Sequence, residues 1–175
     1  MTDEPRATGP GQPRVFRYEV LPTDVRAVRE IVESTGFFRA DEIDVAEELV
    51  QDRLAEGPES GYHFVLAQRG EFVEGYACYG HIACTLASYD LYWIAVHRCC
   101  QGQGLGRVLL AEAERLIRQS GGQRIYVETS GRPQYAPTRA FYEHFGYRAE
   151  AVLADFYAPG DDKVVYVKSL TSSRP

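Results

Sequence analysis

The chain has 175 residues, which is long enough for one domain with a substantial core, and its 45% hydrophobic content excludes an intrinsically disordered protein. Its 19 Lys and Arg against 25 Asp and Glu give a net charge of −6, which argues against nucleic acid as the main partner. No apolar run approaches membrane-spanning length and the N-terminus lacks an apolar leader segment, so we expect no membrane partner and a cytoplasmic location.

The N-terminal third of the chain predicts a tail, one strand and two helices. Residues 1–13 are rich in Pro, Gly and charge, which is typical of a loose tail. Residues 15–20 alternate as a half-buried strand. A helix follows, with Thr23 as its predicted N-cap and Gly36 as its end, and a second, strongly acidic helix covers 41–56.

The middle of the chain predicts three strands and a long helix. The strands cover 62–68, 72–80 and 88–96, with a hairpin turn between the first two. The third strand leads into the segment Gln101-Gly102-Gln103-Gly104-Leu105-Gly106. From Leu105 the apolar residues recur at helical spacing until Gly121-Gly122, which ends the predicted helix.

The glycine-rich segment 101–106 is the most informative stretch for function. Three alternating glycines cost backbone entropy that a simple tight turn does not require. A glycine loop at the start of a helix also offers unpaired N–H groups and the positive end of the helix dipole. We therefore interpret it as an anion site, for phosphate or pyrophosphate, with a simple tight turn as the alternative.

Four cysteines stand at positions 78, 84, 99 and 100, without the CxxC spacing of a zinc site or the pattern of a secreted disulfide-rich protein. If strands 72–80 and 88–96 are antiparallel neighbours, His81 and His97 lie at opposite ends of the sheet. We therefore expect no bound metal. We also expect no cysteine nucleophile, because no orienting histidine and acid partner can be identified near these residues.

The C-terminal third predicts a strand, a short helix and two further strands, at 123–129, 136–145, 147–157 and 163–170. A turn at 159–162 joins the last two strands. The order of elements predicts one α/β (α+β) domain over residues 14–170, followed by a tail at 171–175. We expect a mixed, mostly antiparallel sheet of about six to seven strands with about four helices.

Two motifs resemble the GNAT superfamily of acyl-CoA-dependent N-acetyltransferases. Residues 101–106 fit its acyl-CoA signature, Gln/Arg-x-x-Gly-x-Gly/Ala, directly after a strand and at the start of a helix. Residues 140–147, Ala-Phe-Tyr-Glu-His-Phe-Gly-Tyr, fit its second signature, Phe/Leu-Tyr-x-x-x-Gly-Phe/Tyr. One helix and one strand separate the two motifs, as in the family. The chain departs from the family at Tyr135, where an Asn is common, and at Thr138, where a small Ala is common.

The resemblance implies acetyl-CoA as co-substrate and a primary amine as acceptor, with direct transfer in a ternary complex and no metal. A second copy of the chain is a further candidate partner. By this resemblance, the backbone of Ile94, Ala95 and Val96 aligns the pantetheine arm and the acetyl carbonyl. The pyrophosphate is held by the backbone amides of Gln101, Gly102, Gln103, Gly104, Leu105, Gly106 and Arg107.

Acetyl transfer to an amine also requires an acid for the leaving thiolate and a base for the amine proton. Tyr142 matches the usual general acid of the family, and a phenol with a pKa near 10 is protonated at neutral pH. Asp90 lies fourteen residues before Gly104, where some members carry a catalytic Glu. Glu128, at the end of the next strand, is the competing carboxylate, and a water-mediated route stays open.

Two other functions compete with this interpretation. A non-catalytic acyl-CoA-binding or sensing module could have the same fold. A Rossmann-type dinucleotide enzyme requires G-x-G-x-x-G, but the positions of its last glycine are occupied by Arg107 or Leu109. The sequence leaves the amine open among polyamines, amino acids, antibiotics and protein N-termini, and it also leaves open an acyl group longer than acetyl.

Overall fold

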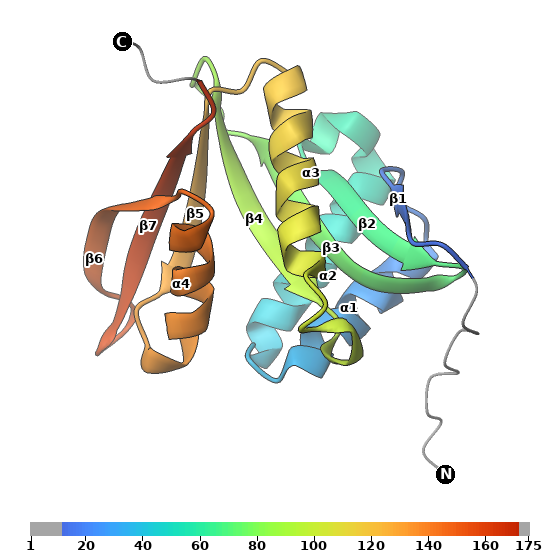
Figure 1. Cartoon of the computed structure of the whole chain (residues 1–175), viewed down its shortest axis with the longest axis horizontal. Coiled ribbons are helices and arrows are strands. Elements are labelled where there is room, and N and C mark those ends of the chain that lie inside the picture. Colours follow the sequence, from blue (N-terminus) through green and yellow to red (C-terminus); the bar gives the residue numbers. More distant parts are fainter. Residues whose placement is uncertain (1–11, 172–175) are drawn as a thin grey trace. The chain divides into compact units, whose positions relative to one another are not determined.

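The computed structural model describes residues 12–171, whose elements are labelled in Figure 1. Within this range the structure contains one seven-stranded sheet, in the order β1-β2-β3-β4-β5-β7-β6, and four α-helices. The β4–β5 pair is parallel, whereas β1–β2, β5–β7 and β6–β7 are antiparallel. The predicted α/β class with a mixed sheet is therefore confirmed. Of the predicted tails, residues 1–11 and 172–175 lie outside the described range.

The chain forms two compact units, which we describe separately. Among residues 12–171, the first comprises 12–78 and 93–113, and the second comprises 79–92 and 114–171. Three elements contribute residues to both units: β3 (Phe72–His81), β4 (Ser88–Val96) and α3 (Leu105–Gln119).

In the first unit, two helices that pack against each other cover strands of the sheet. These helices are α1 (Thr23–Thr35) and α2 (Ala40–Glu56), and the first strands are β1 (Val15–Arg17) and β2 (His63–Arg69). Each of the two helices buries an apolar face. The core joins both helices to β2 and β3 through Val28, Ile31, Val32, Ala46, Val50, Leu66 and Tyr76.

The start of α1 differs from the predicted cap at Thr23. Thr23 is the first helical residue, and the N-cap position is held by Pro22, whose side chain makes no capping bond. The carboxylate of Asp24 instead accepts a 2.7 Å bond from the Leu21 N–H and two 2.7 Å bonds from the Arg17 guanidinium. Asp24 is 1% exposed, so a buried acid ties the first turn of α1 to β1.

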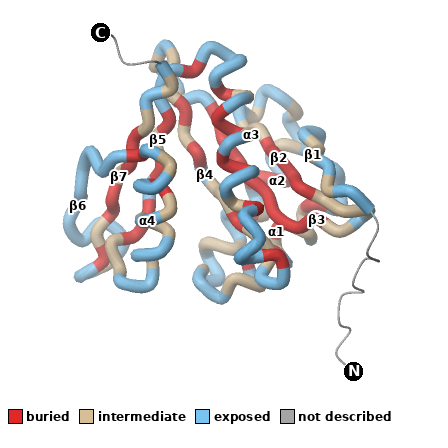
Figure 2. The backbone as a smooth tube through the Cα atoms, viewed as in Figure 1, coloured by how far each residue is buried: buried red, intermediate tan, exposed pale blue. Residues whose placement is uncertain are grey.

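In the second unit, β5 (Arg124–Ser130) lies between β4 and β7 (Asp161–Ser169). The edge strand is β6 (Arg148–Ala158), and the helix is α4 (Ala136–His144). Every residue of β6 is exposed or half-exposed, and Figure 2 shows this strand in pale blue.

The β6–β7 hairpin is tighter than the predicted turn at 159–162, because β7 already begins at Asp161. Asp161 is buried and accepts a 2.5 Å hydrogen bond from the Ser130 hydroxyl, with a 2.9 Å ion pair to Arg132. These contacts draw it into the sheet and leave Pro159 and Gly160 as the turn. None of the helices in residues 12–171 combines the length and apolar character needed to cross a membrane.

Candidate functional site

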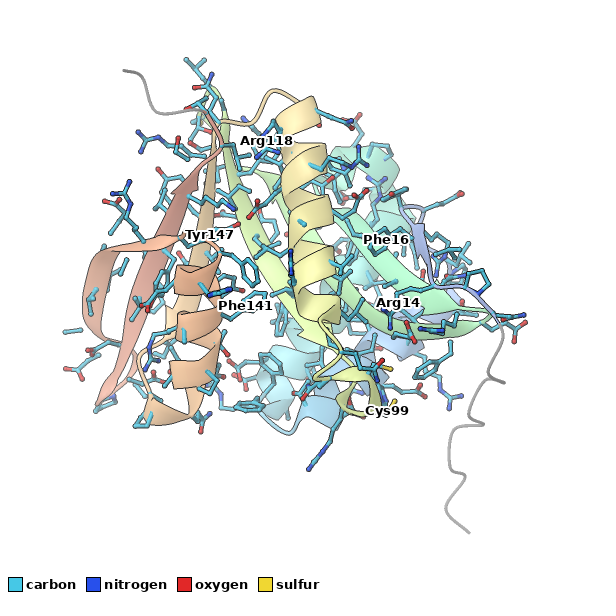
Figure 3. All side chains as sticks on the ribbon, viewed as in Figure 1. Arg14, Phe16, Cys99, Arg118, Phe141 and Tyr147 are labelled. Atoms are coloured by element: carbon cyan, nitrogen blue, oxygen red, sulfur yellow. The ribbon has the colours of Figure 1, made fainter. Side chains whose placement is uncertain are left out.

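The glycine loop joins the end of β4 to the start of α3. A short 3-10 helix, Arg98–Cys100, follows β4, and the loop then runs through Gly102 and Gly104, both with φ of 75°. Figure 3 labels Cys99 on this segment, beside the first turn of α3. Positive φ explains why glycine stands at both positions. No described heavy atom lies within 4 Å of the point that a Cβ would occupy on either glycine, so the space above them is open.

The amide groups of this segment are arranged as an anion site requires. The first bond of α3 runs from the Val108 N–H to the Gly104 carbonyl at 3.3 Å, so the preceding amides of the helix have no acceptor in an earlier turn. The Gln101 N–H makes a long 3.4 Å bond to the Arg98 carbonyl. The amides from Gly102 to Arg107 are therefore the better donors of the predicted set, and the positive end of the helix dipole adds to them.

Side chains of the loop fasten it to the end of β4. The Gln101 side-chain amide donates a 3.0 Å bond to the carbonyl of Val96. On the neighbouring strand, a Cβ on Gly75 would come within 2.8 Å of the Ala95 carbonyl, so glycine permits the close approach of β3 and β4. Ala95 is buried, and Ile94 and Val96 are half-buried. The role of residues 94–96 in aligning a pantetheine arm stays a prediction. The Val96 carbonyl already accepts the hydrogen bond from the Gln101 side chain.

Tyr142 lies on α4, whose length is limited by Pro137 near its start and by Gly146 with φ of 85° after its end. Its ring is 4% exposed and lies 5.4 Å from the ring of Phe141 and 5.5 Å from that of Tyr147, two residues that Figure 3 labels beside α4. Burial raises the pKa of the Tyr142 phenol, which is thus protonated at neutral pH. Within residues 12–171 its hydroxyl has no hydrogen-bond partner.

Tyr147 has a different environment, although it is equally buried. Its hydroxyl donates a 3.1 Å bond to Glu114, and the ammonium group of Lys168 binds the same carboxylate at 2.7 Å. Burial, together with the Glu114 charge and hydrogen bond, raises the pKa of the Tyr147 phenol. The proton of Tyr147 is thus held within the protein, whereas that of Tyr142 is not.

The two candidate bases belong to one electrostatic group with Lys163, which we call the Asp90–Glu128–Lys163 group. Asp90 is half-buried on β4 and pairs with Tyr126 in the parallel register, two residues before Glu128 on β5. Burial first, and then the charge of Glu128, raise the pKa of Asp90, while the charge of Lys163 lowers it. Glu128 itself forms a 2.9 Å ion pair with Lys163. The Lys163 ammonium also lies 3.7 Å from the centre of the Phe156 ring.

Comparison with known proteins places the chain in a family. A family model described as an acetyltransferase (GNAT) domain matches residues 59–149, which is just over half of the chain. A solved structure from Desulfovibrio desulfuricans, assigned to the GNAT family, is 52% identical, covers 91% of this chain and 100% of its own, and superposes with a TM-score of 0.89. The chain belongs to the GNAT acetyltransferase family.

Two further relatives extend the comparison of this GNAT protein. YncA of Salmonella typhimurium, solved with its cofactor acetyl-CoA, has a TM-score of 0.70 at 19% identity over 93% of this chain and 97% of its own, which shows a shared fold. The mycothiol acetyltransferase of Beutenbergia cavernae is 36% identical over 73 residues, 42% of this chain. The match spans only 24% of that enzyme's length.

The structure adds two features of this GNAT protein that the sequence does not predict. Lys163 joins the candidate bases because β7 pairs antiparallel with β5, with Lys163 opposite Ser130 and thus diagonal to Glu128. In addition, the Nδ1 atom of His97 lies 3.0 Å from the sulfur of Cys99, although the sequence predicts no orienting histidine near a cysteine. The 3-10 turn brings these two side chains together. Within residues 12–171, no group of three or more His, Cys, Asp or Glu side chains could hold a metal ion.

Proposed function

We propose that this protein is an N-acetyltransferase that transfers the acetyl group of acetyl-CoA directly to a primary amine. The observation that carries the proposal is the glycine loop at the start of α3 in a GNAT chain. Gly102 and Gly104 adopt positive φ there, and the space at their Cβ positions is open. The diphosphate of acetyl-CoA is the anion that suits this site. That YncA was solved with acetyl-CoA supports the choice of co-substrate.

In the proposed reaction, the amine nitrogen attacks the thioester carbonyl, the C–S bond breaks and a thiolate leaves. Tyr142 donates a proton to that thiolate. Its buried phenol is protonated at neutral pH and has no acceptor among residues 12–171, so its proton is available to a ligand.

Asp90 is the better of the two candidate bases. Its pKa is raised by burial and by Glu128, which moves it toward the range where a carboxylate accepts a proton effectively at neutral pH. Glu128 is half-exposed and its charge is balanced by the 2.9 Å contact to Lys163. We therefore propose that Asp90 accepts the amine proton, directly or through water, and that Glu128 and Lys163 adjust its pKa.

The state of the cysteines bears on the compartment in which the protein works. All four cysteines are free thiols, which supports a reducing compartment such as the cytoplasm.

The edge strand β6 is exposed along its length, with Val152 60% and Phe156 52% exposed. Because exposed apolar edge strands tend to pair, a homodimer is included in the proposal. Light scattering coupled to gel filtration would measure the oligomeric state, and a monomer at micromolar concentration would rule out the homodimer.

The experiment that tests the proposed function has two steps. Thermal-shift titration compares acetyl-CoA with NAD, and only acetyl-CoA should raise the melting temperature. A panel of polyamines, amino acids, aminoglycosides and peptides with free N-termini is then incubated with acetyl-CoA, and acetylated products are detected by mass spectrometry. Acetyl-CoA binding without any product across the panel would favour the non-catalytic acyl-CoA-binding module. Absence of acetyl-CoA binding would remove both functions.

A further inference from the structure

Three side chains between β4 and the glycine loop form a thiol–imidazole cluster, which we call the His97–Cys99–Cys100 cluster. Cys99 is exposed, whereas Cys100 is 6% exposed. The Cys99 sulfur lies 3.0 Å from Nδ1 of His97 and 3.5 Å from the sulfur of Cys100. The His97 ring is held from the other side by an edge contact with Phe72, with ring centres 5.4 Å apart.

The geometry assigns the tautomer of His97. Its Nδ1 atom accepts a 3.3 Å bond from the Cys99 backbone N–H, so this nitrogen carries no proton. Partial burial lowers the pKa of His97, which keeps the imidazole neutral at pH 7. The unprotonated Nδ1 lies 3.0 Å from the Cys99 sulfur, so His97 is placed to accept the thiol proton when the sulfur reacts.

Cys100 is the inert member of the cluster. Burial, and then the contact with the Cys99 thiol, raise the pKa of Cys100 to about 12, so it stays a thiol at neutral pH. A disulfide between Cys99 and Cys100 is disfavoured, because the Cα atoms of adjacent residues are about 3.8 Å apart, closer than disulfides normally bridge. A disulfide of Cys99 therefore needs a sulfur other than that of its neighbour Cys100.

We propose that Cys99 is a modification site that forms mixed disulfides with small-molecule disulfides, with His97 as the proton acceptor. The Cys99 sulfur attacks one sulfur of the disulfide R–S–S–R, whose S–S bond breaks as the Cys99–S–S–R bond forms. The thiol proton passes to Nδ1 of His97 and from there to the departing thiolate, which leaves as R–SH. The small disulfide is the oxidant and is reduced to one thiol, and a dithiol reductant reverses the modification.

The chain contains its own controls for this proposal. Cys84 is also exposed, but its thiol has no side-chain partner among residues 12–171. Cys78 and Cys100 are buried. If exposure alone determined reactivity, Cys84 and Cys99 would react at similar rates. If His97 activates its neighbour, one thiol per chain reacts ahead of the other three.

The test uses the full, reduced chain and the coloured aromatic disulfide DTNB at pH 7, with peptide mass mapping to assign each modified cysteine. We expect a fast phase of one thiol per chain that maps to Cys99, is absent in Cys99→Ser and is retained in Cys84→Ser. His97→Gln should slow the Cys99 reaction about tenfold or more, since a positioned base accelerates proton transfer by at least this factor. The rate of Cys84 in the same sample serves as the internal control for folding.

Equal rates of Cys84 and Cys99 in the parent protein would overturn the proposal without any variant. An unchanged ratio of the two rates in His97→Gln would overturn the role of His97. The measurement contains no acetyl-CoA and no amine, so its outcome is independent of the proposed acetyltransferase reaction.

Discussion

The glycine loop and the Asp90–Glu128–Lys163 group differ in the part of the protein that would carry out their proposed roles, anion binding and proton transfer. The loop uses main-chain amides of consecutive residues, held by positive φ at Gly102 and Gly104 and by the start of α3. The other group uses side chains from three strands, and its charges adjust one another through contacts such as the 2.9 Å pair between Glu128 and Lys163. Binding of an anion by the loop should therefore tolerate side-chain changes, whereas proton transfer in the second unit should not.

Tyr142→Phe should have the largest effect on turnover of any single substitution in the second unit. Loss of a general acid lowers kcat about a hundredfold or more. Because Tyr142 contributes no atom to the loop, the affinity for acetyl-CoA should stay close to the parental value. Steady-state kinetics with the best amine of the panel, together with calorimetric titration of acetyl-CoA, would measure both quantities.

The matched control for this change is Tyr147→Phe, which removes the same hydroxyl from a neighbouring buried ring. The 3.1 Å bond to Glu114 is lost, and stability should fall by about 1 kcal/mol. Lys168 still neutralises Glu114, and kcat should stay near the parental value. Equal losses of kcat in the two variants would mean that Tyr142 acts through packing rather than as an acid.

Asp90→Asn should have the next largest effect, because it removes the proposed base and leaves an amide of similar size. We expect kcat at pH 7 to fall about tenfold or more. Glu128→Gln should have a smaller effect at this pH, since in the proposed reaction Glu128 acts through the pKa of Asp90, which its charge raises. Steady-state values of kcat for both variants test the assignment. A larger loss of kcat in Glu128→Gln than in Asp90→Asn would indicate that Glu128, not Asp90, is the base.

A smaller effect is expected on the pH profile. If Asp90 is the base, activity requires its unprotonated form, and the rate should rise as pH passes upward through the pKa of Asp90. Glu128 raises this pKa and Lys163 lowers it. Glu128→Gln should therefore shift the acidic limb to lower pH, and Lys163→Gln should shift it to higher pH. The pH dependence of kcat/KM in the two variants would measure these opposite shifts. Shifts of both variants in the same direction would indicate a base outside the Asp90–Glu128–Lys163 group.

The same contrast explains how much could be predicted from the sequence. The loop and the second motif are each a run of consecutive residues, so the place of the loop between strand and helix and of the second motif on a short helix could be predicted from the sequence. The contact of Lys163 with Glu128 depends on the register of β5 against β7, which no local pattern contains. The burial of Asp24 and the early start of β7 at Asp161 likewise depend on contacts between elements, with Arg17 on β1 and with Ser130 on β5. His97 and Cys99 are close in sequence, but only the 3-10 turn directs them to one another.

The central claim, that main-chain donors of the loop bind the diphosphate of acetyl-CoA, can be tested with a truncated ligand. S-acetylpantetheine has the same thioester arm but lacks the diphosphate and the phosphorylated adenosine attached to it, so the Gly104→Ala variant is needed to assign the difference to the loop. Two charge-assisted hydrogen bonds, at about 1.5–3 kcal/mol each, correspond to a difference in affinity of about a hundredfold or more between the two ligands. The measurement is calorimetric titration of both ligands into the parent protein, Gly104→Ala and Gly121→Ala.

The two variants are matched, because Gly104 and Gly121 both have positive φ, of 75° and 85°, with open space at the Cβ position. An Ala at either site should cost about 1 kcal/mol of stability through its left-handed backbone. Only Gly104→Ala should weaken the binding of acetyl-CoA, and neither variant should change the binding of S-acetylpantetheine. Equal affinities of the two ligands for the parent protein, or equal weakening of both by Gly104→Ala, would contradict the account.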